Sequence, residues 1–268
     1  MFPIIQSIII GAIQGITEFL PISSSAHLVL VPYLFKWPYH GLTFDVALHF
    51  GTFFAIIIYF WKDWIVIIKS GFTRNSKLET RNSIYPPDLL WKILVASIPA
   101  AIVGLLIESK VEEWFHSPLL LAVNLAVFGL ILWQVDKRAT TRYSILDTSY
   151  SKAFLVGVAQ SLALIPGVSR SGITIVASRA IGLSREQAAR FSFLIGTPAI
   201  LGAFLLQARK LQAGDITIPF VIGIVASTVF GILAIRFLLS YLKRSDLKIF
   251  FWYRLGLTIV IILTFIAR

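Results

Sequence analysis

Six apolar segments, each about as long as a membrane-spanning helix, dominate this sequence. A spanning helix needs about 20 consecutive, mostly apolar residues. Only 14% of the 268 residues are charged, whereas a soluble domain carries about a quarter. We therefore expect an all-α polytopic membrane protein rather than a soluble enzyme. The segments cover residues 44–68, 89–107, 119–135, 188–206, 216–242 and 249–267.

Two further apolar stretches, residues 4–35 and 153–181, are interrupted in the middle. The first break is the sequence PISSS at residues 21–25, and the second is PGVSRSG at residues 166–172. Each half is too short to cross a bilayer comfortably, and proline disfavours a continuous helix. The pattern predicts two re-entrant helical hairpins that enter the membrane and turn back.

The charges of the loops predict how the chain is oriented, because Lys and Arg collect in cytoplasmic loops. Residues 69–92, 136–152 and 243–254 are rich in basic side chains, whereas residues 108–117 carry three Glu and one Lys. The first hairpin is then expected to enter from the outer side and the second from the cytoplasm. This loop bias explains the formal net charge of +11 without a nucleic-acid partner.

Parts of the first hairpin recur in the second. Gly11, Gln14, Ser23 and Ser25 reappear in the same order and spacing as Gly157, Gln160, Ser169 and Ser171. Together with the loop charges, this predicts a single membrane domain over residues 1–268. It would be built from inverted-topology repeats at about 1–135 and 151–268, joined by the linker 136–150. Each repeat would hold one hairpin and three transmembrane helices. The alternative is chance identity among Gly- and Ser-rich membrane segments.

Three ionisable side chains lie inside the broken stretches, where a charge is costly and usually functional. Glu18 and His27 belong to the first hairpin and Arg170 to the second. Gln14 precedes Glu18 by four residues and so shares its helix face. If the hairpin tips meet at mid-depth, the three ionisable groups share one cavity.

Serines follow the proline in both breaks and open the second half of each hairpin. Such residues cap helices and leave free backbone N–H groups and a positive dipole end directed at the cavity. Two of these ends and one guanidinium form an anion site that suits phosphate. The serines are Ser23, Ser24 and Ser25 in the first break, and Ser169 and Ser171 in the second.

Other polar residues have weaker assignments. Thr174 either faces the site or bonds back to its own helix. Asp45 is compatible with a helix cap, and His49 lies one turn further along. Arg179, Arg185 and Arg190 are predicted to form a cytoplasmic charge cluster.

The two breaks and their flanks resemble the signatures of a known family. The sequences QGITEFLPISSSAH at 14–27 and PGVSRSGIT at 166–174 are similar to those of bacterial undecaprenyl-diphosphate phosphatases, the bacitracin-resistance family. The resemblance extends to residues 44–45, 97–100 and 191–194, and so covers nearly the whole chain. It implies an integral hydrolase of the bacterial inner membrane. Such an enzyme removes the terminal phosphate of undecaprenyl diphosphate at the outer leaflet, recycles the lipid carrier of peptidoglycan synthesis and confers bacitracin resistance.

The resemblance also implies a divalent cation, Mg²⁺ or Ca²⁺, for which Glu18 is the candidate ligand. The first position of the family's Glu/Gln-x-x-x-Glu element is Gln14 here, and a neutral amide cannot act as a base. The expected partners are the polyprenyl diphosphate and membrane lipids. A homodimer is compatible with the sequence, which does not fix the oligomeric state.

These residues suggest a mechanism with two versions. Ser24 attacks phosphorus and His27 acts as base or leaving-group acid, or His27 itself attacks and forms a phosphohistidine. Arg170 holds the diphosphate, and Glu18 orients His27 or holds the cation. The candidate substrate-binding residues are Gln14, Ser23, Ser25, Ser169, Ser171 and Thr174.

A second class of function is open to the same architecture. Inverted repeats with broken helices are typical of secondary transporters, in which the N-termini of half-helices bind anionic substrates. The chain would then move a lipid phosphate across the bilayer without hydrolysing it.

Overall fold

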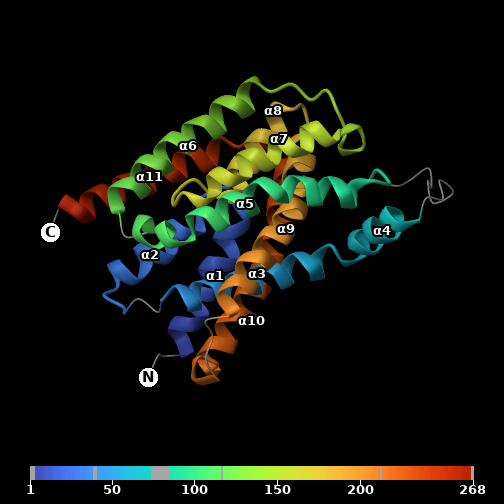
Figure 1. The fold of residues 1–268 in the computed structure, drawn as a ribbon. Coiled ribbons are helices and arrows are strands. Elements are labelled where there is room, and N and C mark those ends of the chain that lie inside the picture. The colour runs from blue at the N-terminus through green and yellow to red at the C-terminus, as the bar shows by residue number, and fades with distance from the viewer. Residues whose placement is uncertain are drawn as a thin grey trace.

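The structure is a computed structural model that describes residues 4–38, 41–73, 85–115, 117–209, 211 and 213–266. These residues form helices and no strand (Figure 1). The α-helices are α1 (Ile4–Phe19), α2 (Ser24–Leu34), α3 (Leu42–Tyr59), α4 (Trp61–Phe72), α5 (Leu89–Phe115), α6 (Pro118–Arg138), α7 (Tyr150–Ser161), α8 (Arg170–Ala180), α9 (Arg185–Ala208), α10 (Ile218–Leu242) and α11 (Lys248–Ile266). Short 3₁₀ turns are η2 (Ile145–Asp147), η3 (Leu162–Leu164) and η4 (Ala213–Asp215).

Five of the described helices, α5, α6, α9, α10 and α11, are long and apolar enough to cross a membrane, and the bent pair α3–α4 can count as a sixth. Their outward faces carry large exposed apolar side chains. Leu105 on α5 is 66% exposed, Ile218 on α10 is 72% exposed and Ile266 on α11 is 73% exposed. Apolar surface of this extent is suited to lipid rather than to water. The prediction of an all-α, multi-pass membrane protein is confirmed at this level.

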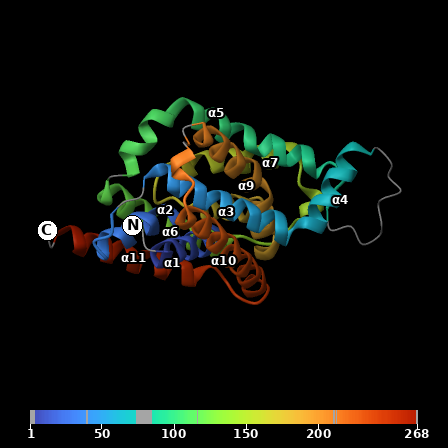
Figure 2. The same ribbon diagram turned by 90° about the horizontal axis from the view of Figure 1, so that it is seen from below.

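The segment predicted as one continuous span at residues 44–68 is interrupted. The chain bends by 77° between α3 and α4, and α4 extends to the edge of the molecule (Figures 1 and 2). The polar start of α4 explains the change of direction. Asp63 accepts a hydrogen bond from Arg190 Nη1 on α9 at 3.4 Å, so the first turn of α4 is held against α9.

The prediction of a loop at residues 108–117 is wrong, because α5 continues as a helix to Phe115. The acidic residues there are good helix formers, and residues 105–117 contain no Gly or Pro that would end the helix. Ser117 then caps α6 by accepting a hydrogen bond from Leu120 N at 3.3 Å. Residues 74–84 of the predicted basic loop 69–92 lie outside the described residues.

Both interrupted stretches form two helices with a break between them, as the prolines predict. α1 ends at Phe19 and α2 begins at Ser24, while α7 and η3 are followed by α8 at Arg170. The residue before each second helix has a positive φ, 73° for Ser23 and 72° for Ser169. Such a backbone is uncommon for a residue with a side chain. In both breaks, a serine with left-handed backbone therefore turns the chain just before the second helix.

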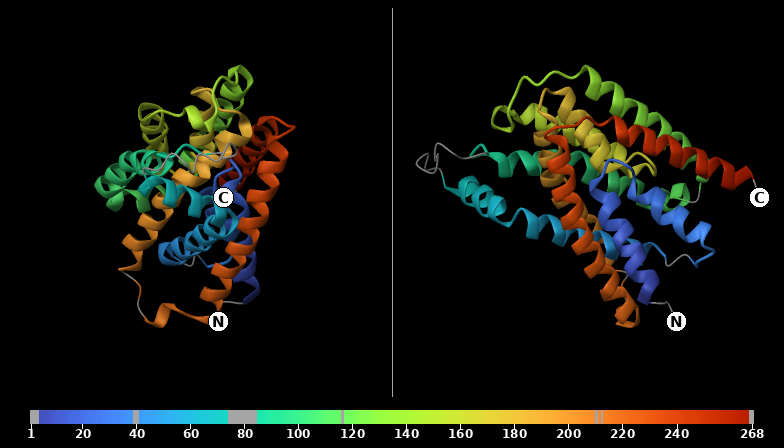
Figure 3. Two further views of the ribbon diagram at one scale, coloured as in Figure 1. Left: turned by 90° about the vertical axis from the view of Figure 1, so that its right-hand side faces the viewer. Right: turned by 180° about the vertical axis from the view of Figure 1, so that it is seen from behind.

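The first helix of each hairpin packs closely on a long helix from the other half of the chain. α1 packs on α10, and α7 packs on α5. Glycines allow both approaches: a Cβ on Gly11 would collide with the backbone of Gly223, and a Cβ on Gly157 would collide with the backbone of Ala96. α6 and α11 run side by side on another face of the molecule (Figures 1 and 3).

The predicted linker 136–150 is fastened to the helices around it. Asp136, only 3% exposed, accepts hydrogen bonds from Arg179 Nε at 3.0 Å and Arg185 Nε at 2.8 Å. Arg179 also donates to Ala139 O at 2.8 Å. The predicted arginine cluster is therefore divided, because Arg190 pairs with α4 instead.

Candidate active site

The breaks in the two interrupted stretches lie in direct contact. Gly167 N in the second break donates to Ser25 Oγ in the first at 3.3 Å. Ser171 Oγ donates to Leu20 O at 3.1 Å. Each break thus uses a serine of the other break to satisfy part of its backbone, which helical hydrogen bonds no longer serve.

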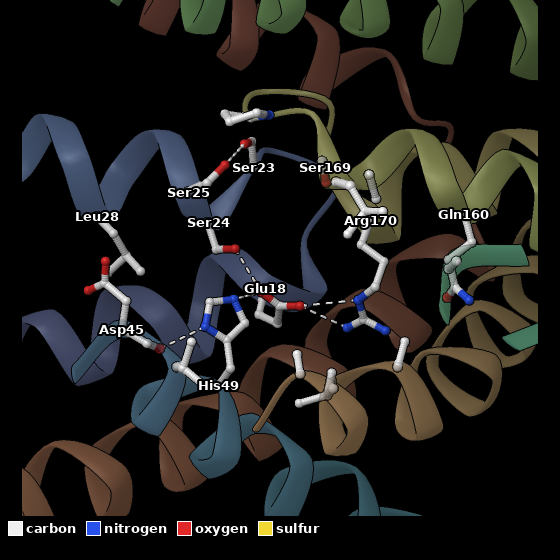
Figure 4. Close-up of a pocket in the computed structure, with 18 residues that line it drawn as sticks. Glu18, Ser23, Ser24, Ser25, Leu28, Asp45, His49, Gln160, Ser169 and Arg170 are labelled. Atoms are coloured by element: carbon white, nitrogen blue, oxygen red, sulfur yellow. Dashed lines mark hydrogen bonds and ion pairs between the residues drawn. The ribbon is translucent and has the colours of Figure 1, made fainter. Parts of the chain in front are cut away.

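A cavity of about 260 Å³ lies beside this contact (Figure 4). One wall is polar and comes mainly from α1, α2, α3 and the two breaks. The opposite wall is formed by small and apolar side chains of α5, η3 and α9. The polar lining is Glu18, Ser23, Ser24, Ser25, Asp45, His49, Gln160, Ser169 and Arg170, and the apolar lining includes Leu28, Ala100, Leu164, Ala199, Ile200 and Ala203.

Glu18 lies at the centre of the polar wall and joins the two hairpins (Figure 4). Its Oε1 accepts hydrogen bonds from Arg170 Nη2 at 2.8 Å and Nε at 3.3 Å. Its Oε2 accepts from Ser24 Oγ at 2.7 Å and from Gln14 Nε2 at 3.1 Å. The structure therefore brings together Glu18, Ser24, Arg170 and Gln14, as predicted. A hydroxyl that donates to a buried carboxylate is arranged to lose its proton to that carboxylate.

Arg170 has donor capacity beyond its pair with Glu18. Its Nη1 is buried without a hydrogen-bond partner in the described part of the chain. Gly196 on α9 leaves the room for this guanidinium, because a Cβ at residue 196 would collide with Nη1. Arg170 therefore keeps an N–H group that no described residue uses, beside the pair with Glu18.

His49 also contacts Glu18, although its sequence position alone carried little weight. His49 Nε2 lies 3.3 Å from Glu18 Oε2, and His49 Nδ1 lies 2.7 Å from Asp45 O. Both ring nitrogens face acceptors, and a neutral imidazole has only one N–H to donate. The doubly protonated ring is therefore the form that satisfies both contacts. An ionisable residue inside a predicted span was the available signal for His49.

The structure does not bring His27 into this cavity. His27 Nδ1 lies 2.7 Å from Ser23 O, and Nε2 lies 2.7 Å from Tyr253 OH. His27 instead lines a separate cavity of about 360 Å³ between α1, α10 and α11. The rotation of α2 gives the reason: Leu28, four residues after Ser24, faces the first cavity, and His27 is displaced by about 100° from Leu28.

Ser169, in the second break, has the capping role expected from the sequence. Ser169 Oγ accepts a hydrogen bond from Gly172 N at 3.2 Å and so caps α8. It also lies 3.2 Å from Ser171 Oγ, as Ser23 Oγ lies 3.0 Å from Ser25 Oγ in the first break. Ser23 makes no side-chain cap to α2. The capped N-terminus of α8 carries Arg170 at its first residue.

Thr174 bonds back to its own helix, which is one of its two predicted roles. Its Oγ1 donates to Arg170 O at 2.7 Å and lies against Ser192 Oγ. It does not line the cavity. Thr174 therefore supports α8 rather than contacting the contents of the cavity.

The described residues offer no ready site for a divalent cation. They contain no group of three or more His, Cys, Asp or Glu side chains placed to hold a metal ion. Both oxygens of Glu18 are already engaged, and Arg170 and His49 place positive charge beside them. The fit of a protein-held Mg²⁺ or Ca²⁺ is therefore poor.

Comparisons with a family model and with individual proteins indicate the same family for this chain. A family model described as bacitracin resistance protein BacA matches residues 7–260. A protein of Pelotomaculum thermopropionicum named undecaprenyl-diphosphatase is 45% identical over 261 residues, 97% of this chain and 96% of its own length. Proteins of the same name from Moorella thermoacetica and Desulforudis audaxviator are 46% and 45% identical. They cover 99% and 96% of this chain, and 99% and 97% of their own lengths.

Proposed function

The chain belongs to the family of bacitracin resistance protein BacA, and we propose how its cavity removes a phosphate from a lipid. It hydrolyses undecaprenyl diphosphate to undecaprenyl phosphate and inorganic phosphate, and so recycles the lipid carrier of peptidoglycan synthesis. The chain is a membrane hydrolase of the bacitracin-resistance type, and its role lies in cell-wall synthesis. No observation favours the transporter alternative.

The contact between Ser24 and Glu18 carries the proposed mechanism. Ser24 Oγ, 2.7 Å from Glu18 Oε2, attacks the terminal phosphorus while its proton passes to Glu18. The bond from phosphorus to the bridging oxygen breaks, and undecaprenyl phosphate leaves with that oxygen. Glu18 then gives up that proton to solvent. Water attacks the phosphorus of the phosphoserine and passes a proton to Glu18, which returns it to Ser24 Oγ as the bond from phosphorus to Oγ breaks and phosphate leaves. A lipid monophosphate is a good leaving group, so this first step needs no strong acid.

Arg170 changes its partner in this scheme. In the structure it is paired with Glu18 at 2.8 Å, and its Nη1 has no hydrogen-bond partner among the described residues. The bound diphosphate takes over part of the guanidinium, which frees Glu18 to accept the Ser24 proton. The Ser169 end of α8 adds N–H groups and the positive end of the helix dipole. Ser23 and Ser25 line the same wall and complete the oxygen contacts.

We assign the orientation of Glu18 to His49 and Gln14, both of which contact Glu18 Oε2. His27 has both ring nitrogens engaged outside the cavity, so it supports the first break rather than serving as the base. The phosphohistidine version would require His27 to leave Ser23 and Tyr253. We therefore place Ser24 first as nucleophile.

The apolar wall of the cavity is suited to the lipid end of the substrate. Ala199, Ile200 and Ala203 on α9 face the polar wall together with Ala100 on α5. We propose that the first isoprene units lie against this wall while the diphosphate meets Arg170. A mostly apolar pocket with a few convergent polar groups is typical of small-molecule sites.

The membrane arrangement proposed here follows from loop charge and helix pairing. The pairs α1 with α10 and α7 with α5 correspond under exchange of the two halves, which supports inverted repeats of one hairpin and three spans. The basic loops then lie in the cytoplasm, and the cavity opens to the outer, periplasmic side of the bacterial inner membrane.

No step of this mechanism uses a protein-held metal ion, because the described residues do not fit one. The family resemblance still implies dependence on Mg²⁺ or Ca²⁺, and we propose that the cation arrives bound to the diphosphate substrate. Both halves of the site come from one chain. A homodimer would leave this site complete within each copy.

Phosphate release by the purified protein in lipid bilayers tests the proposal. The unaltered chain is expected to release phosphate from undecaprenyl diphosphate, and Ser24→Ala is expected to lower turnover at least about 1,000-fold. Ser161→Ala is a matched control, because Ser161 Oγ only bonds back to Val158 O. A Ser24→Ala protein that releases phosphate at a tenth or more of the normal rate would remove Ser24 from the role of nucleophile.

A further inference from the structure

Arg254 on α11 is a buried cation that the mechanism so far leaves unused. Its side chain is fully buried, and it is the largest fully buried side chain in the described part of the chain. None of the ion pairs among the described residues includes it. A charged residue inside a spanning helix is rare and is usually functional.

The contacts of Arg254 lie at the second break. Its Nη2 donates to Gly167 O at 2.6 Å and to Val168 O at 2.7 Å. These are consecutive carbonyls immediately before Ser169, the residue with φ of 72°. One amino group of α11 therefore fixes both peptide units that lead into the left-handed residue.

The surrounding helices are shaped to admit the Arg254 side chain. On α6, a Cβ at Gly129 would lie within 3.4 Å of Cβ and Cδ of Arg254. On α8, a Cβ at Gly172 would lie 3.3 Å from Arg254 Nη1. Arg254 thus passes beside α6 and ends behind the first turn of α8. Its Nε and Nη1 have no hydrogen-bond partner in the described residues. The hydrogen bonds of the Arg254 side chain to described residues are therefore those from Nη2 to the two carbonyls.

A residue that served only to fill space would not need this arrangement. An apolar side chain fills such a position without a buried charge, and replacing buried charges by apolar residues is often neutral or stabilising. The guanidinium is therefore retained for what its donors do. They reach only the turn that sets the direction of α8, and α8 begins with Arg170.

We propose that Arg254 is the positioning residue of Arg170. By holding the carbonyls of residues 167 and 168, it fixes the turn at Ser169 and aims the Arg170 side chain into the cavity. Arg254 does not touch the substrate, and its effect on turnover passes through Arg170. This inference depends on the role proposed above for Arg170. A small displacement of a positioned catalytic group is enough to lower the rate substantially.

Steady-state phosphate release by purified variants, assayed in bilayers with undecaprenyl diphosphate, tests this inference. Arg254→Gln is expected to lower kcat/KM about 100-fold, and Arg254→Lys is expected to recover part of that loss. In an Arg170→Ala background, adding Arg254→Gln should lower kcat/KM less than about threefold further, because groups that act as a unit are not additive. A residue with a separate structural role would multiply the two losses.

The matched control is Thr258→Val on the same helix. Thr258 is buried, and its Oγ1 donates to Ala122 O at 3.2 Å and back along its own helix to Arg254 O at 2.9 Å. Thr258→Val leaves the Arg254 guanidinium in place, so activity should stay within threefold of normal. Equal activity of Arg254→Gln and the unaltered chain would overturn the proposal, as would multiplicative losses in the double variant. Failure to recover any folded Arg254 variant while Thr258→Val folds would show a structural role instead. Full activity of Arg170→Ala would overturn the role of Arg170 itself, whatever Arg254 does.

Discussion

Ser25 and Ser171 occupy corresponding places in the two breaks, and each bonds to the backbone of the opposite break. Ser25 Oγ accepts from Gly167 N at 3.3 Å, and Ser171 Oγ donates to Leu20 O at 3.1 Å. The two bonds are reciprocal and link segments far apart in the sequence. They hold the hairpin tips in the relation that lets Glu18 on α1 reach Arg170 on α8.

Removal of these two hydroxyls should loosen the junction. Ser25→Ala and Ser171→Ala are each expected to lower the free energy of unfolding by about 1 kcal/mol. Denaturant unfolding in detergent measures this, with Ser151→Ala on the exposed end of α7 as the control. Losses no larger than those of the control would show that packing alone holds the tips together.

Arg170→Lys is expected to lose at least about 100-fold in kcat/KM although the charge is kept. An ammonium is a point charge and cannot reproduce the fork of N–H groups that Arg170 offers to Glu18 and to phosphate oxygens. Steady-state phosphate release measures the loss. Arg142→Lys serves as the control, because Arg142 is exposed and bonds to Thr140. Near-normal turnover of Arg170→Lys would refute the assignment.

The two histidines should respond differently to substitution. His49→Ala removes a contact to Glu18 and is expected to lower kcat/KM about 10- to 100-fold. His27→Ala and Tyr253→Phe both remove the hydrogen bond between His27 and Tyr253. Both variants should therefore unfold at a lower temperature while kcat stays close to normal.

Quenching the reaction with labelled substrate is expected to trap acid-stable phosphate on Ser24. Acid-labile phosphate on His27 would instead support the phosphohistidine version.

Single cysteines should report the orientation of the chain, because the native sequence contains no Cys. A cysteine at Ala203, in the lining of the cavity, is expected to react with an impermeant thiol reagent added outside. One at Lys152 is expected to react only from the cytoplasm. The opposite labelling pattern would reverse the orientation deduced from the loop charges.

The sequence predicted a shared cavity for Glu18 and Arg170, although not their ion pair, because the physical reason is local. An ionisable residue beside a proline break in an apolar stretch is expensive unless it meets a partner or a ligand, and each break carries such residues. The capping role of Ser169 was predictable on the same grounds. For these residues, composition and order along the chain contain the information.

The rotation of a half-helix after a left-handed residue is not local information. Ser23 at φ of 73° sets which face of α2 meets the cavity, and this decides between Leu28 and His27. The same is true of the bend after Tyr59, which depends on the contact of Asp63 with Arg190. The rotation of α2 and the bend after Tyr59 both depend on contacts between segments far apart in the chain, so the local sequence did not predict them.

In the ion pair with Arg170, the Glu18 carboxylate occupies the guanidinium that an anionic ligand would bind. Free phosphate, the second product, must displace Glu18 from the guanidinium before it can bind well, and it brings no isoprenoid tail to the apolar wall. Undecaprenyl diphosphate offers both a multiply charged head and that tail. We therefore expect free phosphate to inhibit the enzyme only weakly as it accumulates, because it gains too little to open the Glu18–Arg170 pair.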